Sequence, residues 1–232
     1  MAYKQVAGTS NEAFRDEWVT SSLSRLRALH EAPSLLDVGA GSSPYRAKAL
    51  ELGFTYRSHD FSAYVPEQSA PGLQSVTWDY APHQYVCDIL DIPQEASADL
   101  VLCTEVLEHV PDPVRAFQKM AELVRPGGQL VVSVPFLSLM HQSPFWFQSG
   151  LSPFWFEYWA AKTNLVVDEL TVQGDYADLM SQEVSRLLAF KPHIKGLSRV
   201  GGNLAKKLRG RLSADVLQSG AFGTLFIGSL PQ

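Results

Sequence analysis

The chain has 232 residues, of which 46% are hydrophobic and 19% charged, and its formal net charge is −5. This composition is typical of a globular domain and excludes an intrinsically disordered chain. The negative balance provides no basic field, so we expect no nucleic acid as a partner. The chain starts without an apolar signal region, and its longest apolar run, Leu130 to Met140, is shorter than the roughly 20 residues that cross a bilayer. We expect a cytoplasmic protein with Cys87 and Cys103 as reduced core residues.

The first third of the chain alternates between predicted helices and strands. Apolar residues along 11–31 predict an amphipathic helix, and the apolar run 33–39 predicts a buried strand. Residues 44–53 predict a helix with a proline in its first turn and a glycine past its end, and 54–60 predict a strand. The turn-rich stretch 62–84 is expected to be a loop or an insertion.

The alternation continues to the end of the chain. The clearest predicted helix has Asp112 as its cap and Pro113 in its first turn, and Gly127 with Gly128 is expected to end it. The other predicted elements are strands at 85–89, 99–105, 129–136, 165–172 and 222–230, and helices at 153–163 and 176–190.

Apolar strands that alternate with helices predict an α/β fold, with a doubly wound, mostly parallel sheet and helices on both faces. We divide this single domain into an N-terminal helical cap (1–32), a Rossmann-like core (33–175) and a C-terminal helical insertion with the final strand (176–232). Ligands of such sheets bind beyond the carboxyl ends of the strands. The candidate site therefore comprises the residues at those ends: Asp37 to Gly41, Asp60, Asp88 and Thr104 to His109.

A glycine loop follows the strand at 33–39. Gly39 and Gly41 let the backbone turn tightly and approach a ligand, and Asp60 ends the next strand, where an acid can bind both ribose hydroxyls. Pro44 stands where the dinucleotide fingerprint has its third glycine, and the Asp37 carboxylate would repel a pyrophosphate but attract an ammonium or sulfonium group. Both residues count against a nicotinamide cofactor. An ordinary strand-to-helix turn is the alternative interpretation.

Five ordered stretches carry a resemblance to a known family. They are "LLDVGAGSSPY", "HDFS", "YVCDILDIP", "DLVLCTEVLEHVPDPVRAF" and "LVRPGGQLVVSVPF", between about residues 33 and 136. Together they resemble class I S-adenosylmethionine-dependent methyltransferases, in the group with LEHV-PDP and L-PGG motifs. The resemblance implies a seven-stranded Rossmann-like sheet whose last strand is antiparallel, with S-adenosylmethionine as the cofactor.

The resemblance also implies roles for the residues at the strand ends. The loop would hold the methionine part, Asp60 the ribose, Asp88 and Ile89 the adenine, and Thr104 and Glu105 the sulfonium and amino acid portion; the loop residues are Asp37, Gly39, Ala40 and Gly41. A turn cap is the alternative role for Asp88, and Asp91 could compete with it for the adenine.

Two histidines are candidate bases for a hydroxyl acceptor. His109 follows the fourth core strand, and because histidine side chains ordinarily titrate near neutral pH, it is either a catalytic base or part of the scaffold. His141 precedes the aromatic stretch and is either a second base or a surface histidine. The spacing Glu-x-x-Glu-His also occurs in ubiquinone-pathway O-methyltransferases, and this resemblance implies a divalent cation. As a secondary hypothesis, Mg²⁺ would be held by Glu105, Glu108 and His109.

The pentapeptide SPFWF occurs twice, starting at Ser143 and at Ser152. Exposed aromatic side chains of this size mark binding surfaces, so we predict that the acceptor contacts Phe145, Trp146, Phe147 and Trp155. The alternatives are core packing, with Ser152 capping a helix, and a dimer or membrane contact.

Basic residues are concentrated in 191–211, where seven of the 19 lysines and arginines lie. This segment is either a solvated helix face or a peripheral contact with an anionic membrane or substrate carrier. The resemblance to methyltransferases implies O-methylation, and the aromatic and basic stretches lead us to expect a small-molecule, sugar-linked or lipid-linked acceptor. The alternatives are a non-catalytic S-adenosylmethionine-binding partner protein and a nicotinamide-dependent oxidoreductase.

Overall fold

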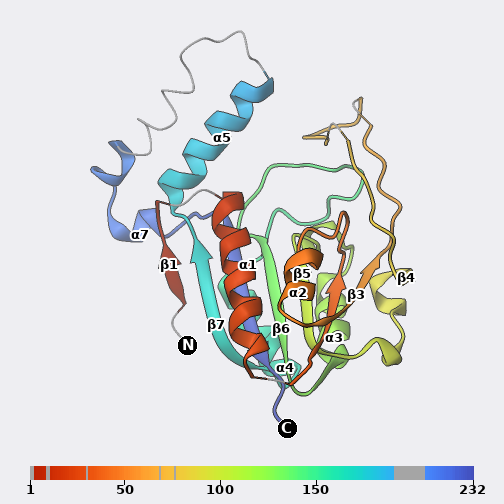
Figure 1. Cartoon of the computed structure of the whole chain (residues 1–232). Helices are drawn as coiled ribbons and strands as arrows, with labels where there is room; N and C mark the ends of the chain where they lie inside the picture. Colours follow the sequence, from red (N-terminus) through yellow and green to blue (C-terminus); the bar gives the residue numbers. More distant parts are fainter. Residues whose placement is uncertain (1–2, 9–10, 30, 68, 76, 191–206) are drawn as a thin grey trace.

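A computed structural model describes the chain except for residues 1–2, 9–10, 30, 68, 76 and 191–206. Its centre is one eight-stranded sheet with the order β1-β7-β8-β6-β5-β2-β3-β4 (Figure 1). The strands are β1 (Lys4–Val6), β2 (Ser34–Val38), β3 (Thr55–Asp60), β4 (Tyr85–Val86), β5 (Ala98–Thr104), β6 (Val124–Pro135), β7 (Val166–Gln173) and β8 (Gly223–Ser229). The helices are α1 (Asn11–Arg27), α2 (Arg46–Glu51), α3 (Pro113–Leu123), α4 (Pro153–Lys162), α5 (Tyr176–Phe190) and α7 (Ala214–Leu217), with short 3₁₀ turns η1 (Ile89–Asp91), η2 (Gln94–Ala96) and η3 (Leu107–His109).

The sheet confirms the predicted mixed α/β architecture and adds one strand to it. Only β8 runs antiparallel to its neighbours, β6 and β7, and every other pair is parallel. Seven strands were expected, but β1 pairs with β7 and forms an eighth at the edge. Residues 1–32 therefore contribute a strand as well as a helix. A strand of three residues is too short for its side chains to show an alternating pattern.

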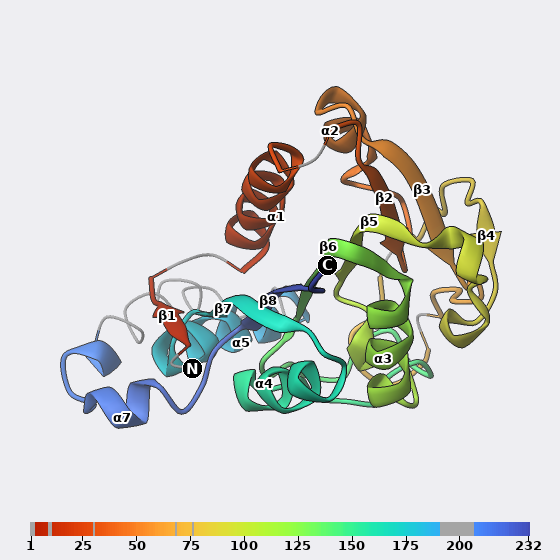
Figure 2. The ribbon, with the colours of Figure 1, turned by 90° about the horizontal axis from the view of Figure 1, so that it is seen from below.

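Helices cover both faces of the sheet, and each face has its own core (Figure 2). On one face, α1 and α2 bury Trp18, Leu23 and Ala49 against the sheet. On the other, α3 and α4 contribute Phe117 and Phe156, both fully buried. The central strands β2 and β5 and residues 130–134 of β6 are mostly apolar and buried, because they are covered on both sides.

Several element ends differ from the predicted ones. The first helix stops at Arg27, and Leu29, predicted on its apolar side, is 64% exposed. Asp112 caps α3 as predicted, since its side chain accepts a hydrogen bond from the Arg115 amide. The predicted glycine stop is wrong, because α3 passes directly into β6 and Gly127 and Gly128 lie inside that strand.

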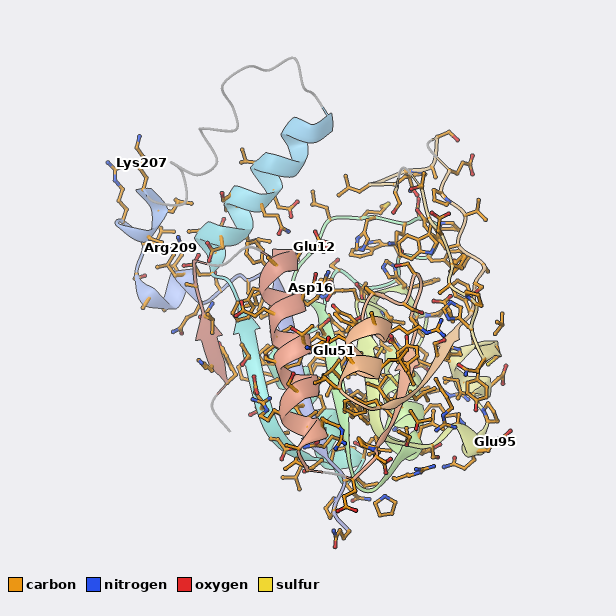
Figure 3. The ribbon with its side chains drawn as sticks, in the orientation of Figure 1. Glu12, Asp16, Glu51, Glu95, Lys207 and Arg209 are labelled. Carbon is orange, nitrogen blue, oxygen red and sulfur yellow. The ribbon has the colours of Figure 1, made fainter. Side chains whose placement is uncertain are left out.

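The remaining predictions concern cysteines, membrane segments and the basic stretch. Cys103 is buried and Cys87 is half-buried, and both are free thiols. Among the described residues, no helix is both long and apolar enough to span a membrane. Most of the basic segment 191–211 lies outside the described residues. Its Arg209, labelled in Figure 3, forms ion pairs with Asp175 (2.8 Å) and with Asp178, so this guanidinium is engaged by the protein's own acids.

Candidate active site

One cavity of about 710 Å³ opens at the carboxyl ends of β2, β3 and β5. Parallel strands whose crossovers diverge leave such a crevice, and it is where ligands bind in this architecture. The structure brings every predicted cofactor residue to its wall: Asp37, Gly39, Ala40, Gly41, Asp60, Asp88, Ile89, Thr104 and Glu105. His109, His141, Phe145 and Phe147 line the same cavity.

The glycine loop requires its two glycines for steric reasons. Gly39 has φ +70° and Gly41 has φ +52°, a region that residues with a Cβ rarely adopt. A Cβ on Gly39 would also lie 2.4 Å from the Val106 side chain. Asp60 fixes the loop from the next strand, because its carboxylate accepts the Gly41 amide at 2.9 Å and the Ser62 amide at 2.7 Å.

Asp37 is the most deeply buried acid of the cavity wall, with 1% of its surface exposed. Burial raises its pKa to about 7, and the hydrogen bond from the Tyr56 hydroxyl (2.7 Å) only partly opposes this shift. Asp60 nearby raises the pKa of Asp37 further. The carboxyl group of Asp37 therefore changes its charge near neutral pH, and it does so in the wall of the ligand cavity.

Asp88 has the turn-cap role that the sequence offered as an alternative, and it also lies in the cavity wall. It lines the cavity, and its Oδ1 also caps η1 by accepting the Leu90 amide at 2.9 Å. Ile89 lies beside it with 5% of its surface exposed. Asp91 is not among the residues that line the cavity.

Glu105 is held in place by two partners. Its backbone has φ +54°, the Ser133 hydroxyl donates to its Oε1 at 2.9 Å, and the Arg15 guanidinium lies 3.5 Å from its Oε2. Arg15 comes from α1 and is the only lysine or arginine that lines the cavity in the part of the chain the structure describes. The sequence analysis did not identify Arg15 as a site residue. Two acids of the same helix, Glu12 and Asp16, also line the cavity, and both are labelled near the start of α1 in Figure 3.

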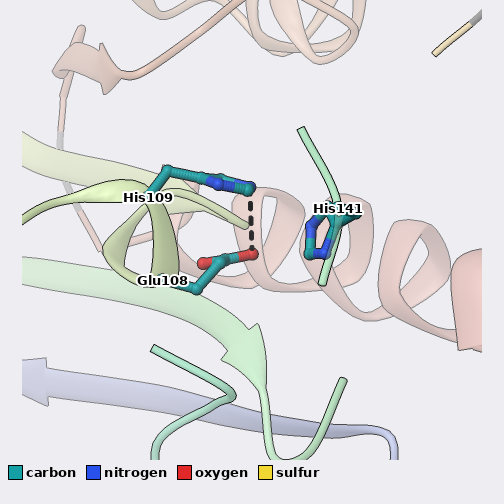
Figure 4. Close-up of side chains that lie close together, drawn as sticks. All are labelled: Glu108, His109 and His141. Carbon is teal, nitrogen blue, oxygen red and sulfur yellow. Dashed lines mark ion pairs between the residues drawn. The ribbon is translucent and has the colours of Figure 1, made fainter. Parts of the chain in front are cut away.

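The two candidate bases meet at the far side of the cavity. The rings of His109 and His141 are 4.8 Å apart, edge to face, and the carboxylate of Glu108 lies 3.7 Å from Nε2 of His109 (Figure 4). Burial lowers the pKa of His109 to about 4, although its hydrogen bond to the Phe145 carbonyl opposes the shift. Glu108 is fully buried, and burial together with nearby Glu105 raises its pKa well above the usual range.

The predicted Mg²⁺ ligands are not brought together as a set. Glu105 is turned toward Ser133 and Arg15, whereas the cluster that the structure assembles is Glu108, His109 and His141. A hard ion such as Mg²⁺ prefers oxygen ligands, and this cluster offers one carboxylate beside two imidazoles. The residues present therefore do not fit the predicted Mg²⁺ site.

The four aromatic residues predicted to contact the acceptor separate into three environments. Phe145 and Phe147 line the cavity, where Phe145 meets Phe61 edge to face at 5.0 Å. Trp146 packs against the imidazole of His141, with ring centres 4.5 Å apart. Trp155 does not reach the cavity: it packs on Phe117 and Phe156 in the core.

The stretch 61–84 supplies further aromatic wall that sequence reasoning did not assign to the site. Tyr64, Trp78 and Tyr80 line the cavity, and the Ala81 amide donates to the carbonyl of Gly41 at 2.9 Å. The same stretch is tied to the loop before Phe145, because Leu73 exchanges backbone hydrogen bonds with Met140 and Gln142. The many turn residues of this stretch predicted a loop. The fold adds that this loop forms part of the cavity wall.

The chain matches the family described as "Methyltransferase domain" over residues 12–171. This match covers more than half of the chain, so the chain belongs to the methyltransferase-domain family, and it confirms the resemblance to class I S-adenosylmethionine-dependent methyltransferases. A ubiquinone biosynthesis O-methyltransferase of Xanthomonas oryzae pv. oryzae is 38% identical over 112 residues, which are 47% of this chain and 44% of that protein. A ubiquinone biosynthesis O-methyltransferase of Xanthomonas campestris pv. campestris is 33% identical over 165 residues, which are 66% of this chain and 65% of that protein. The chain thus spans less than half the length of the first of these relatives.

Solved structures support the fold. Phosphoethanolamine N-methyltransferase 2 of Haemonchus contortus, in complex with S-adenosyl-L-methionine, matches with a TM-score of 0.54 and 17% identity over 93% of this chain and 53% of that one. N-methyltransferase NodS of Bradyrhizobium japonicum matches with a TM-score of 0.51 and 15% identity over 96% and 100%. At these identities the likeness establishes the fold alone.

Proposed function

We propose that this protein transfers a methyl group from S-adenosylmethionine to a hydroxyl oxygen of a small-molecule acceptor. One observation carries the proposal: a single cavity joins a half built from the glycine loop and acids to a half walled by imidazoles and aromatic rings. The named activity of the relatives that share up to 38% identity supports oxygen as the accepting atom.

The charges of the first half, here called the cofactor half, suit S-adenosylmethionine. That molecule carries a sulfonium and an ammonium group but only one carboxylate. The cavity wall holds one arginine, Arg15, among six carboxylates: Glu12, Asp16, Asp37, Asp60, Asp88 and Glu105. In this proposal Arg15 receives the cofactor carboxylate, Glu105 the ammonium, Asp60 the ribose and Asp88 with Ile89 the adenine. When bound, the cofactor supplies a methyl group that is already activated.

The second half, here called the acceptor half, consists of Phe61, Phe145, Phe147, His109 and His141 together with their neighbours at this end of the cavity. Aromatic rings and imidazoles, with no lysine or arginine among these five, favour an acceptor whose buried part is uncharged and aromatic or apolar. A sugar or a lipid chain would then extend from it to the outside. The two imidazoles activate the hydroxyl, and the chain's other task is to align acceptor and methyl group.

A binding experiment followed by a mass measurement tests the proposal. Calorimetry should show binding of S-adenosylmethionine and none of NAD. The chain and cofactor are then incubated with matched acceptors: a phenol, its methyl ether, a sugar alcohol and an aromatic amine. We expect one methyl group to be gained by the phenol only. Cofactor binding with no methyl gain by any acceptor would instead favour a non-catalytic binding partner, and a gain by the amine alone would overturn oxygen as the target.

A further inference from the structure

A tyrosine and an aspartate from two different helical segments meet beside Arg15. The Tyr45 hydroxyl donates a hydrogen bond to Oδ1 of Asp16 at 2.8 Å, and the same oxygen lies 3.5 Å from Nε of Arg15. All three residues line the cavity, with Asp16 on α1, where Figure 3 labels it, and Tyr45 immediately before α2. One carboxylate oxygen therefore connects the arginine of the cofactor half to the neighbouring helix.

Helix geometry alone does not place the Asp16 carboxylate beside Arg15. Side chains that are adjacent in a helix do not face each other, so a contact between them needs a partner that holds one of them in place. The Asp16 side chain is 49% exposed, and without such a partner water would solvate its carboxylate in several rotamers. The hydrogen bond from Tyr45 selects the rotamer in which Oδ1 lies near the guanidinium.

Tyr45 can hold this contact because its own position is fixed. Its ring is 5% exposed and belongs to the core on the face of α1 and α2, together with Trp18 and Leu23. Its carbonyl oxygen accepts the Ala49 amide at 2.9 Å in the first turn of α2. Burial and the hydrogen bond to Asp16 raise the pKa of the Tyr45 hydroxyl, so this group stays protonated and donates at neutral pH.

The position of the Arg15 guanidinium depends on nearby charges. Its Nε is buried and has no hydrogen-bond partner among the described residues, and its Nη1 lies 3.5 Å from Oε2 of Glu105. An arginine side chain has many rotamers, so the two carboxylates beside it decide where it lies. Without the fixed Oδ1 of Asp16, the guanidinium would be drawn toward Glu105. That closer pair would compete with both charged groups of a zwitterionic ligand.

We propose that Tyr45 is a positioning residue: through Asp16, it holds Arg15 in the orientation that binds the carboxylate at the amino acid end of S-adenosylmethionine. This role rests on the proposed function, and it involves no contact of Tyr45 or Asp16 with the reacting atoms. The expected consequence is selective. Ligands that carry the amino acid end gain affinity from the contacts among the three residues, and ligands that lack this end gain none.

Two matched ligands test this role by calorimetry. S-Adenosylhomocysteine and 5′-methylthioadenosine share the adenosine and the thioether sulfur, but only the first carries the carboxylate and the ammonium group. Tyr45→Phe keeps the buried ring and removes the hydroxyl, so it should weaken S-adenosylhomocysteine binding by about tenfold, as expected for one hydrogen bond to a charged group. The affinity for 5′-methylthioadenosine should change by less than about twofold. Tyr85→Phe is the matched control, because that hydroxyl lies 3.5 Å from Arg57 and Tyr85 does not line the cavity; both affinities should stay at their wild-type values.

A double-mutant cycle shows whether Tyr45 acts through Asp16. Asp16→Ala should weaken S-adenosylhomocysteine binding as Tyr45→Phe does, and Tyr45→Phe in the Asp16→Ala background should add less than about twofold. Circular dichroism checks the fold of each variant. Asp16→Ala, at a half-exposed position, provides the same comparison of the two ligands if Tyr45→Phe fails to fold.

The two proposals fail in different ways. A wild-type chain that binds no S-adenosylhomocysteine would overturn the proposed function and the role of Tyr45 with it. If the wild-type chain does bind this ligand, three results would overturn the role of Tyr45 alone. They are a folded Tyr45→Phe variant with wild-type affinity, an equal loss of affinity for both ligands, and effects of Tyr45→Phe and Asp16→Ala that multiply in the double variant.

Discussion

The two halves of the cavity are built in different ways. In the cofactor half, the predicted residues lie at or just beyond the carboxyl ends of strands of one sheet, and the backbone itself forms the wall at Gly39 and Gly41. In the acceptor half, apart from His109 in η3, the wall comes from two loops, 61–84 and 136–150, that are far apart in sequence and bonded to each other. The first half is therefore set mainly by the chain at the strand ends, and the second depends mainly on contacts between distant loops. Changes in one half should leave the other's ligand affinity intact.

The largest effect is expected from a substitution that damages the acceptor half alone. His109→Ala should lower the rate of methyl transfer by about 10²–10⁴-fold, because it removes a group that activates the hydroxyl. Affinity for S-adenosylmethionine should change by less than about twofold, since distant sites act independently. Rates from mass spectrometry and affinities from calorimetry check this, with H83A as the control. A parallel fall of rate and cofactor affinity would contradict the separation of the halves.

The next effect breaks the cofactor half. Gly39→Ala combines a strained φ with a clash against Val106, and we expect the free energy of unfolding to fall by about 2–4 kcal/mol. Gly8→Ala is the matched control: it has φ +77° but nothing within 4 Å of its added Cβ, so it should cost only about 1 kcal/mol. Denaturant unfolding measures both. Equal losses would show that the contact with Val106 does not matter.

A smaller effect is expected from the loss of one aromatic ring in the acceptor half. Phe145→Ala should raise the KM for an aromatic acceptor roughly tenfold, because it removes a buried ring contact, with no change in the KM for S-adenosylmethionine. Phe154→Ala, at a ring that is 65% exposed and packs on Tyr3, should alter neither value. Steady-state kinetics with each substrate varied in turn would show it. A rise in both KM values after Phe145→Ala would mean that this ring belongs to both halves.

The smallest effect follows from protonation of Asp37. Its pKa of about 7 lies above that of an unfolded aspartate, so the carboxylate is lost below neutral pH and with it an attraction for the cationic cofactor. Affinity for S-adenosylmethionine should fall several-fold, roughly, from pH 8 to pH 6, and Asp37→Asn should flatten the profile. Linkage gives the opposite sign for stability: the contribution of Asp37 is present below about pH 4 and is lost as pH rises through 7. Calorimetry and denaturant unfolding across this range check both slopes.

The contrast between the halves also explains what the sequence could predict. The mostly apolar strands β2 and β5, the glycine loop and Asp60 were identifiable because their constraints act within a few residues of the chain. Arg15, Trp78 and the position of Trp155 were not, because nothing local distinguishes an arginine facing a cavity from one facing solvent. The Glu-x-x-Glu-His spacing did not show that Glu105 turns away from Glu108 and His109, since the orientation of Glu105 is set by Ser133, on another strand, and by Arg15, on α1.

The bonds between the two loops restrict how this protein could acquire a new acceptor. Leu73 pairs with the Met140–Gln142 backbone, Ser143 donates to the carbonyl of Pro71, and Gln74 donates to Ser143. If residues 136–150 were replaced by the loop of a relative, the new loop would lack the matching hydrogen-bond partners in 61–84. Under the proposed function, acceptor specificity depends on both segments together, and exchange of 61–84 along with 136–150 is the smallest substitution that keeps their mutual hydrogen bonds.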